Sequence, residues 1–532
     1  MFTGTLFPYQ YDAVESIVRL RKILVAYSMG TGKTVLTLAA LEEMLGAGSI
    51  KNALILVPAA VKWQWAMAVA KFTDVDRQTI NLRGAELEVG VEEMCMVIHG
   101  TAKRRAEQWE YSRLTCPDYV IASVSAVRND WHEILQTPFD AVVLDEATVI
   151  KHFSAQVTKK IKTLKPATRI ALTGTPVENL PEEIFSIMEW VNADILGRWD
   201  LFDKSYISRN YFGGVQSYKN LDLMHSRLKR AMIRKSRLDP EVAKYLPDVV
   251  EATRSVTLPA PTRKVYKRIL ADLSIALDEL AATGETFDLA AYYAGIPSGA
   301  ERSAQGKVMG RILATRLLLD DPRLLMDSAV AYHEDKGAGS EYVAGLVASL
   351  RTGIDVLAAP KLDELERQVV DMLAEPGTKV AVFTCYRRML PYVIERLALR
   401  GIEYTQYHGG MSAEEKAASK ARFDTDEDCR VFVSTNAGGY GLDLPRAQFL
   451  INYDLPDSRG VYDQRNTRHV RASSTHEKVY VLNLIVEDTL EERQLATLHM
   501  RGRLGSAIVD GQGGATVKHD VETLTEHLGR AI

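Results

Sequence analysis

Short, almost uninterrupted apolar runs alternate along this chain with longer segments whose apolar residues have helical spacing. A run that is apolar at every position suits a strand buried on both faces, as in parallel sheets joined by helical crossovers. In the first part of the chain the runs are Leu24–Tyr27, Ala53–Val57, Tyr119–Ser123, Ala141–Asp145 and Arg169–Thr173. In the second part they are Lys379–Thr384, Glu403–Tyr407, Arg430–Ser434, Gln448–Asn452 and Lys478–Asn483. The pattern predicts an α/β fold with two parallel-sheet lobes.

The two sets of strands divide the chain into four parts. We expect one lobe at residues 1–195 and a second at 355–500, alike in fold although no sequence repeat is visible. Residues 196–354 carry few strand signals and much Ala, Leu, Arg and Asp at helical spacing, which predicts helical insertions and a linker. The glycines at 511, 513 and 514 indicate that residues 501–532 form a loosely held tail.

The composition of this 532-residue chain indicates in which compartment the protein functions and whether it contacts a membrane. Four cysteines, at 95, 116, 385 and 429, are too scattered for a zinc site or a disulfide framework and favour a reducing compartment. No signal peptide is visible, and no uncharged apolar run approaches the roughly 18–20 residues of a membrane helix. We expect an intracellular, cytoplasmic monomer without membrane contact, with the nucleus as the alternative location.

A glycine-rich turn follows the first apolar run and leads into a helical pattern at Val35–Leu45. It reads Ser28-Met29-Gly30-Thr31-Gly32-Lys33-Thr34. Glycines at such a turn let backbone N–H groups wrap phosphates, and the following helix adds a favourable dipole. The residues from Met29 to Thr34 are predicted to bind ATP, with Lys33 on the β- and γ-phosphates and Thr34 on Mg²⁺. Tyr27 replaces the first glycine of the full phosphate-binding loop (P-loop) motif. The competing interpretation is therefore a glycine-rich turn that precedes a helix by chance.

Two carboxylates, Asp145 and Glu146, end the apolar run that begins at Phe139. Ligands collect at the carboxyl ends of parallel strands. We expect Asp145 to hold Mg²⁺ through water and Glu146 to act as the general base for the attacking water. An isolated acidic pair commonly lies in an exposed turn. Here the apolar strand before the pair and the upstream P-loop favour a catalytic site.

In the second part Gln464, Arg468 and Arg471 recur at i, i+4 and i+7. We interpret Gln464–Arg471 as a helix that presents the three side chains on one face. Such a face is most often only solvated, but beside the first-lobe site it predicts arginines that reach the γ-phosphate when the lobes close. The glycines of Ser434–Asp443 let a phosphate approach the backbone, and Asp443 is expected to reach the ribose.

The order of these motifs resembles superfamily-two helicases and, within them, the Swi/Snf-type double-stranded DNA translocases. The similarity runs from about residue 5 to residue 500. It rests on FPYQYDAVE (7–15), MGTGKT (29–34), LILVPAAVKWQW (54–65), ASVSAV (122–127), DEATVIKHFSAQ (145–156), LTGTPVENLPEEIFSIMEWV (172–191), APKLDELE (359–366), STNAGGYGLDL (434–444) and VEDTLEER (486–493). The resemblance implies two RecA-like lobes that use ATP and Mg²⁺, with Gln10 reading the adenine. The P-loop of the family also lacks the first glycine.

The chain departs from the family pattern at several positions. Ser28 stands where an acidic residue is usual, and Thr148 replaces the common His or Gln. After Arg471 the family has Ile-Gly-Gln, where this chain has Ala472-Ser473-Ser474, and Val470 replaces the preceding His. These changes spare ATP hydrolysis and put its coupling to a duplex in question. Without chromatin-reading domains, the chain is interpreted as a minimal microbial or viral relative.

Sequence-independent binding to a nucleic-acid backbone requires basic side chains and exposed backbone N–H groups. The candidates are Lys62, Trp63, Lys151, His152, Arg387, Arg388, Thr435 and Gly438. The basic stretch at 227–237, RLKRAMIRKSR, is a further candidate, for which a solvated helix face is equally expected. Trp63 and Trp65 are candidates to stack on bases, although core packing is favoured.

The sequence therefore predicts an Mg²⁺- and ATP-dependent helicase or translocase that moves along DNA, with duplex DNA favoured. An RNA helicase is the alternative within this class, and a degenerate motor acting as a DNA-binding scaffold is the alternative outside it. Lys33, Asp145, Glu146, Arg468 and Arg471 are all retained, which argues against the scaffold. A P-loop kinase would not require the arginines of the second part.

Overall fold

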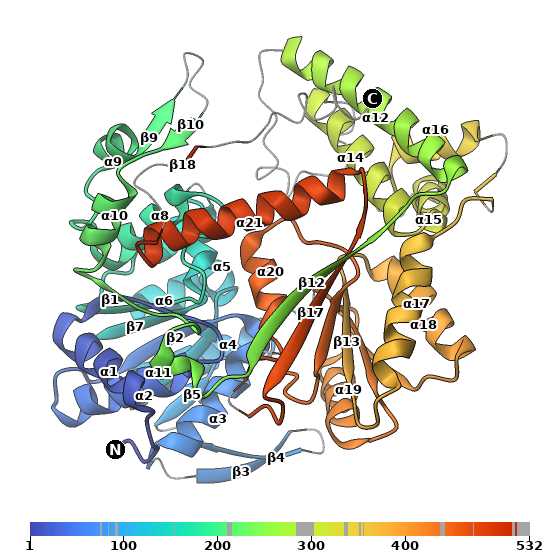
Figure 1. The fold of residues 1–532 in the computed structure, drawn as a ribbon. Coiled ribbons are helices and arrows are strands. Elements are labelled where there is room, and N and C mark those ends of the chain that lie inside the picture. The colour runs from blue at the N-terminus through green and yellow to red at the C-terminus, as the bar shows by residue number, and fades with distance from the viewer. Residues whose placement is uncertain are drawn as a thin grey trace.

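The protein folds into two α/β lobes that lie side by side, with a group of helices above the second lobe (Figure 1). This computed structural model describes residues 1–74, 77–82, 85–90, 94–153, 155–209, 215–282, 303–334, 339–350, 353–354, 356–436, 442–471, 473–512 and 517–518. Each lobe is built around a parallel sheet, and every apolar run predicted as a strand coincides with one. The predicted fold class is confirmed.

The first sheet has the strand order β11-β1-β8-β7-β2-β6-β5, and each strand is parallel to its neighbours. Its strands are β1 (Lys22–Tyr27), β2 (Ala53–Val57), β5 (Cys95–Val97), β6 (Tyr119–Ser123), β7 (Ala141–Asp145), β8 (Thr168–Leu172) and β11 (Met232–Lys235). Along β2, Leu54 and Leu56 join the hydrophobic core on one face, while Ile55 and Val57 join the core on the other. The continuous apolar runs therefore reflect burial on both faces.

Helices cover both faces of the first sheet. One face carries α1 (Pro8–Leu20), α2 (Lys33–Gly46) and α3 (Lys62–Phe72). The other carries α4 (Ala102–Thr115), α5 (Ala126–Asn129), α6 (Trp131–Gln136), α7 (Gln156–Thr163), α8 (Pro181–Asn192), α9 (Trp199–Tyr206) and α10 (Leu221–Leu228). The P-loop and the acidic pair lie at the carboxyl ends of β1 and β7. Because these strands are parallel and separated only by β8, both motifs lie on one edge of the sheet.

The second sheet has the order β12-β17-β16-β13-β15-β14 and is also parallel throughout. Its strands are β12 (Asp248–Val256), β13 (Val380–Thr384), β14 (Tyr404–Tyr407), β15 (Val431–Thr435), β16 (Phe449–Asn452) and β17 (Lys478–Val486). Its helices are α17 (Pro360–Leu373), α18 (Leu390–Leu399), α19 (Ala413–Thr425), α20 (Arg459–Asn466) and α21 (Leu490–Val509).

Residues 196–354 contain more than the predicted helical insertion and linker. The helices α12 (Ala260–Ala282), α14 (Ala304–Asp320), α15 (Arg323–His333) and α16 (Glu341–Ser349) share a core with the second lobe. However, β11 belongs to the first sheet and β12 to the second. Both are edge strands, and β12 is largely exposed, so neither has the continuous apolar sequence of a central strand. The segment therefore completes both sheets.

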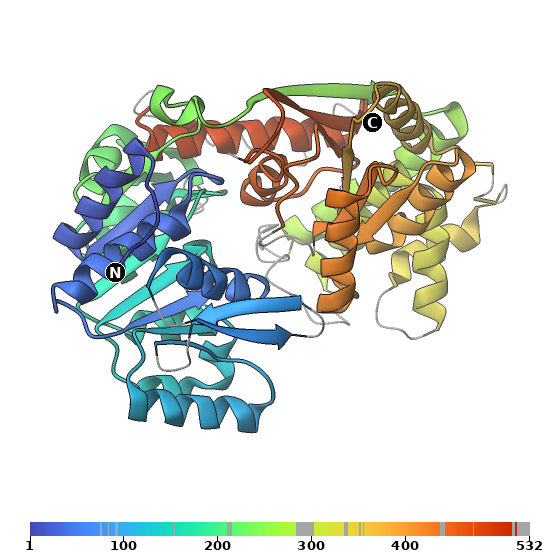
Figure 2. The same cartoon turned by 90° about the horizontal axis from the view of Figure 1, so that it is seen from below.

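Two elements join the lobes. After α11 (Pro240–Ala243), β12 enters the second lobe and pairs with β17 from Asp248↔Lys478 to Val256↔Val486. From the end of β17, α21 returns across the molecule to the first lobe (Figure 1). There Ile508 is buried in the first-lobe core, and its carbonyl oxygen lies 3.0 Å from His225 Nδ1. Seen from below, both connections run along the same side of the molecule (Figure 2).

The prediction of a loosely held tail from residue 501 is wrong for residues up to Asp510. The helix continues to Val509, and Asp510 pairs with Arg234 at 2.7 Å. Further along, β18 (Val517–Lys518) pairs with β10 (Val215–Tyr218), which pairs with β9 (Ile207–Arg209). A second small sheet joins β3 (Arg77–Leu82) and β4 (Ala85–Gly90). Within the described residues, no helix has the length and apolar character needed to cross a membrane.

Candidate nucleotide site between the lobes

The P-loop connects β1 to α2 and depends on two glycines with left-handed backbone conformation. Gly30 and Gly32 both have φ of 80°, which side chains disfavour. A Cβ at Gly32 would also lie 2.4 Å from Gln10 Nε2. Lys33 Nζ donates to the carbonyl oxygens of Tyr27 at 2.9 Å and Ser28 at 3.3 Å. The lysine ammonium group is therefore hydrogen-bonded at the loop. When phosphates bind, their oxygens would replace the two carbonyl oxygens as its acceptors.

Gln10, which the resemblance implies reads the adenine, lies beside the P-loop. It is buried on α1, where its Oε1 accepts from Phe7 N at 2.8 Å and its Nε2 donates to Thr31 O at 2.9 Å. Tyr9 donates to the same carbonyl oxygen at 3.1 Å. The start of α1 is thus hydrogen-bonded to the P-loop. Its role in reading adenine stays a prediction.

The acidic pair lies at the end of β7 with a strained backbone. Glu146 has φ of 51°, an uncommon value for a residue other than glycine and one that is found most often at functional sites. Its Oε2 is buried and has no hydrogen-bond partner among the described residues. Burial, together with the charge of Asp145, raises the pKa of Glu146 to about 7, against the opposing effect of Lys33. A carboxylate with such a pKa suits a general base at neutral pH.

Asp145 is positioned by a tryptophan whose role the sequence did not reveal. Trp65 Nε1 donates to Asp145 Oδ2 at 2.8 Å, and Glu146 N donates to Oδ1 at 3.0 Å. Trp65 is 2% exposed, so the favoured prediction of core packing is correct for this residue. Burial raises the pKa of Asp145, although the hydrogen bond from Trp65 and the charge of Lys33 oppose the shift.

The second lobe brings its arginines to the P-loop through a turn instead of the predicted helix. α20 ends at Asn466, and Thr467 donates its hydroxyl proton to Asp463 O at 2.7 Å as the chain leaves the helix. Arg468 and Arg471 therefore follow the helix, whereas Gln464 is buried within it. The prediction of one helical face is wrong, because the helical pattern stops before the second of the three residues.

The turn touches the P-loop directly. Thr467 Oγ1 lies 3.1 Å from Met29 Sδ. A Cβ at Gly30 would lie 2.8 Å from Val470 O and 3.4 Å from Arg471 Nη1. Burial lowers the pKa of Lys33, and the positive charge of Arg471 contributes to the shift. The structure thus brings Arg471 to the P-loop. Its predicted contact with the γ-phosphate stays a prediction.

Arg468 and Asp443 complete this part of the site. Arg468 is buried, its Nη1 donates to Leu442 O at 3.0 Å, and its positive charge partly offsets the raised pKa of Glu146. Asp443 accepts from Arg471 Nε at 2.7 Å. In this conformation Asp443 orients an arginine, and its predicted contact with a ribose stays a prediction.

A second contact between the lobes lies at Glu178, which the sequence did not single out. Its carboxylate is paired with Lys151 and accepts from Ser458 Oγ of the second lobe at 3.0 Å. Burial raises the pKa of Glu178, although Lys151 opposes the shift. Lys151, predicted to bind nucleic acid, is therefore paired at the lobe boundary.

The other candidate nucleic-acid residues do not form one cluster. Lys62 donates to Ile98 O at 2.8 Å, and Trp63 packs edge-on against His99 with ring centroids 5.2 Å apart. In the second lobe, Arg388 donates to Asp327 O at 3.0 Å. His152 and Arg387 are exposed, Thr435 is buried, and Gly438 lies outside the described residues. These assignments stay predictions.

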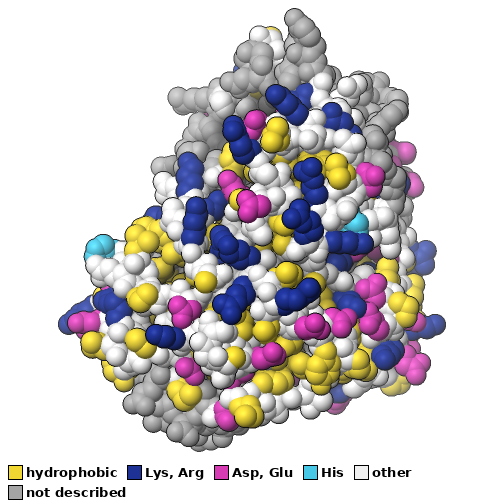
Figure 3. Space-filling view, turned by 90° about the vertical axis from the view of Figure 1, so that its left-hand side faces the viewer, with side chains coloured by type: hydrophobic (Ala, Val, Ile, Leu, Met, Phe, Trp, Pro, Cys, Tyr) yellow, Lys and Arg dark blue, Asp and Glu magenta, His cyan; other side chains and the backbone are white. Residues whose placement is uncertain are grey.

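Basic side chains gather on an outer face of the molecule. Figure 3 shows many Lys and Arg side chains on the side where α9 and α10 lie in Figure 1. Arg227, near the end of α10, and Lys229 and Arg230, which follow this helix, belong to the predicted basic stretch and are exposed. In the same stretch, Arg234 pairs with Asp510 and Lys235 with Glu241. The stretch is thus divided between exposed and paired residues.

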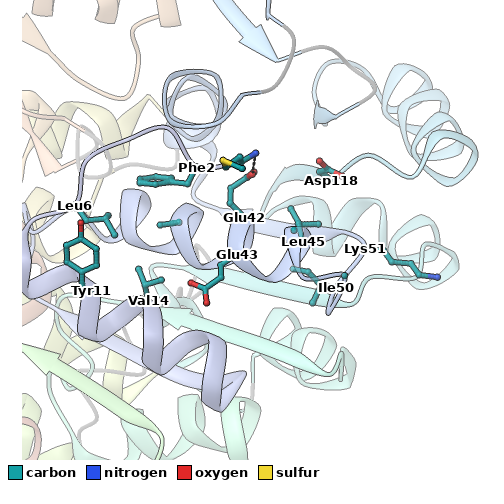
Figure 4. Close-up of a pocket in the computed structure, with 14 residues that line it drawn as sticks. Phe2, Leu6, Tyr11, Val14, Glu42, Glu43, Leu45, Ile50, Lys51 and Asp118 are labelled. Atoms are coloured by element: carbon teal, nitrogen blue, oxygen red, sulfur yellow. Dashed lines mark ion pairs between the residues drawn. The ribbon is translucent and has the colours of Figure 1, made fainter.

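A cavity of ≈ 800 Å³ lies between α1 and α2 (Figure 4). Phe2, Leu6 and Val14 form part of its apolar wall, and Glu42 and Glu43 add carboxylates. The predicted nucleotide-binding residues are all described, and none of them lines this cavity. The cavity is separate from the nucleotide site.

The residues between the lobes fit ATP and Mg²⁺. Gly30 and Gly32 adopt a backbone conformation that residues with a side chain disfavour, and Lys33 would supply the cation for the phosphates. Thr34, in the first turn of α2, and Asp145, at the end of β7, would supply oxygen ligands of the kind that Mg²⁺ prefers. The buried Oε2 of Glu146, which has no hydrogen-bond partner among the described residues, would be free to accept a proton from water.

Comparison with known proteins agrees with this geometry. The SNF2-related domain matches residues 9–291, and the helicase conserved C-terminal domain matches residues 360–473. The uncharacterized ATP-dependent helicase YqhH of Bacillus subtilis is 24% identical over 530 residues, which are 98% of this chain and 83% of that protein. The ATP-dependent DNA helicase DDM1 of Arabidopsis thaliana is 24% identical over 533 residues, which are 96% of this chain but only 62% of the plant protein.

A solved structure shows the same fold. The Hef helicase domain of Pyrococcus furiosus superposes with a TM-score of 0.51 at 17% identity, covering 92% of this chain and 98% of that one. The SNF2-related match covers more than half of this chain, and the helicase C-terminal match falls on the second lobe. The predicted resemblance is confirmed, and the chain belongs to the SNF2-related family of helicase-type ATPases.

Proposed function

We propose that this protein is an ATPase that is stimulated by duplex DNA and uses ATP hydrolysis to move along it. The observation that carries the proposal is the contact of the Thr467–Arg471 turn of one lobe with the P-loop of the other. A nucleotide bound at this contact would touch both lobes. Its hydrolysis would therefore change how the lobes fit together, which is what a motor requires.

The first lobe would bind the phosphates and activate water. Lys33 would leave the carbonyl oxygens of Tyr27 and Ser28 to contact the β- and γ-phosphates. Thr34 and Asp145 would hold Mg²⁺, which supplies charge neutralisation at the phosphates when bound. Glu146 Oε2, buried and unpartnered, would accept a proton from the attacking water.

The second lobe would stabilise the transferred phosphoryl group. Arg471 already lies against Gly30, and the charge of Arg468 acts on Glu146. Arginines supplied to such a site contribute roughly 10³–10⁵ in rate in other phosphoryl-transfer enzymes. Since both halves of the site come from one chain, we propose that a monomer is sufficient for catalysis.

Duplex DNA is the proposed substrate because the chain belongs to the SNF2-related family and because of how its relatives are named. One relative is named a DNA helicase, and the SNF2-related match, residues 9–291, includes most of the first lobe. The exposed side chain of Arg387 and the basic face of Figure 3 provide positive charge for a phosphate backbone. Whether strands separate as the protein moves is a distinct property, which the test below does not require.

The test is the steady-state ATPase rate without nucleic acid and with duplex DNA, single-stranded DNA or RNA. We expect strong stimulation by duplex DNA, and no turnover by Lys33→Ala under any of these conditions. A larger response to RNA or to single-stranded DNA would replace the duplex translocase with a strand-separating helicase. A rate equal to that of Lys33→Ala throughout would refute the motor.

A further inference from the structure

A hydrogen-bonded series of polar side chains begins on β12, the strand that connects the lobes. Glu251 of this strand accepts the hydroxyl proton of Tyr462 on α20. Asn483 Nδ2, on β17, donates to the same Glu251 oxygen at 3.0 Å and to the Tyr462 hydroxyl at 2.8 Å. His499 of α21 also lies 3.5 Å from this carboxylate. One side chain of β12 therefore contacts three other elements of the second lobe.

The series continues through the sheet and returns to α20. Asn452 Nδ2, on β16, donates to Asn483 Oδ1 at 2.9 Å and to Asn466 Oδ1 at 2.9 Å. Tyr462, Asn452 and Asn483 are fully buried, and Asn466 is 6% exposed. The helix α20 is thus held at two points, Tyr462 and Asn466, by a series that starts at Glu251.

The end of α20 leads directly to the P-loop contact. Asn466 is the last residue of the helix, and Thr467, which follows it, lies 3.1 Å from Met29 Sδ. Val470 and Arg471, against Gly30, follow within the same turn. The placement of Asn466 therefore sets where the arginine turn begins.

Burial alone does not explain why polar residues occupy these positions. An amide placed in a sheet interior costs stability unless it is hydrogen-bonded, and an apolar residue of similar size would avoid that cost. The neighbouring positions Leu450 and Ile451 of β16 are apolar and fully buried. A fully hydrogen-bonded network instead fixes one arrangement of the elements it joins. The network thus fixes the position of α20 relative to β12 and to the rest of the second sheet.

We infer that Glu251, Tyr462 and Asn483 are positioning residues for the ATPase proposed above. They transmit the position of the connecting strand β12 to the turn that carries Arg468 and Arg471. A movement of the first lobe displaces the start of β12, and the network passes this displacement to the arginines. None of the three residues is among those proposed to bind the nucleotide, so their loss should lower the rate of the chemical step and leave ATP affinity unchanged.

Two variants test the inference. Glu251→Ala removes the shared acceptor from a largely exposed strand, and Tyr462→Phe removes one hydroxyl while the His499 contact remains. We expect kcat for duplex-stimulated ATP hydrolysis to fall by about tenfold in each, since a lost hydrogen bond to a charged group has an effect of this size on the barrier. KM and the Kd of a fluorescent ATP analogue should stay at wild-type values. Glu251→Gln keeps an acceptor oxygen and should restore most of kcat.

Two controls separate positioning from stability. Thr253→Ala alters an exposed residue on the same strand, and Tyr480→Phe removes a tyrosine hydroxyl from β17; both should retain the wild-type kcat. Thermal unfolding of every variant should remain cooperative with a similar midpoint. Wild-type kcat in Glu251→Ala and Tyr462→Phe would overturn the inference while the ATPase stands. A wild-type chain without any turnover would overturn the proposed function and, with it, this inference.

Discussion

The pKa of one buried carboxyl group governs the expected pH dependence of turnover. The pKa of Glu146 is raised to about 7, chiefly by burial and then by Asp145. Below this pH the group is protonated and cannot accept a proton from water. We therefore expect kcat to fall about tenfold for each pH unit below the pKa and to reach a plateau above it. Glu146→Gln should abolish turnover at every pH and still bind ATP; a Gln variant with near-normal turnover would rule out this base.

Trp65 illustrates what a sequence does not disclose about a site. Asp145 and Glu146 are recognisable because they end a buried strand, but Trp65 is 80 residues away from Asp145. Its hydrogen bond depends on how α3 packs against the first sheet, which no local pattern encodes. Spacing is sufficient to identify residues that share one strand or turn, and insufficient for partners that only the tertiary fold brings together.

The hydrogen bond from Trp65 should affect Mg²⁺ binding at the proposed site. Trp65→Phe keeps the ring in the core and removes the donor to Asp145 Oδ2. Groups that orient a metal ligand typically contribute 10–100-fold in metal affinity or activity. We expect the Mg²⁺ concentration for half-maximal ATPase activity to rise by about tenfold, with cooperative unfolding preserved. Trp109→Phe offers a matched control, since Trp109 is also buried in this lobe but bonds Asp130 at 3.4 Å.

At the level of elements, the sequence predicted strands well and connections poorly. The run Ala53–Val57 is apolar throughout because β2 is buried on both faces. β12 has no such run because its side chains are largely exposed at the edge of the second sheet. The end of α20 was misplaced because Gln464, Arg468 and Arg471 fit a helical period that the chain abandons at Thr467.

The helix α21 should couple the stabilities of the two lobes. Ile508 is 0% exposed and lies in the first-lobe core, although its helix starts in the second lobe. Replacing a buried Ile by Ala typically costs about 2–5 kcal/mol, because packing is lost and a cavity remains. We expect Ile508→Ala to lower the free energy of unfolding of the first lobe by this amount in denaturant titrations. Leu399→Ala, at a 77% exposed position, should have almost no effect.

At the level of the whole molecule, attraction to DNA must arise from local charge. The net charge is −4, so the chain as a whole is not drawn to a polyanion. Binding would depend on basic side chains that displace cations from DNA phosphates, and each such contact lowers affinity as salt rises. The contact between the lobes, in contrast, involves buried and partly buried groups, for which screening by salt is weaker.

Salt should therefore separate DNA binding from catalysis. We expect the duplex concentration for half-maximal stimulation to rise steeply with KCl. In a plot of log affinity against log salt, the slope should be about −0.9 for each phosphate contacted. The rate at saturating DNA should change little over the same range, because Lys33 and Glu146 are partly buried and Arg468 is buried. A flat salt response of the stimulation would contradict backbone binding, and a parallel loss of the saturated rate would place the salt-sensitive step at the lobe contact itself.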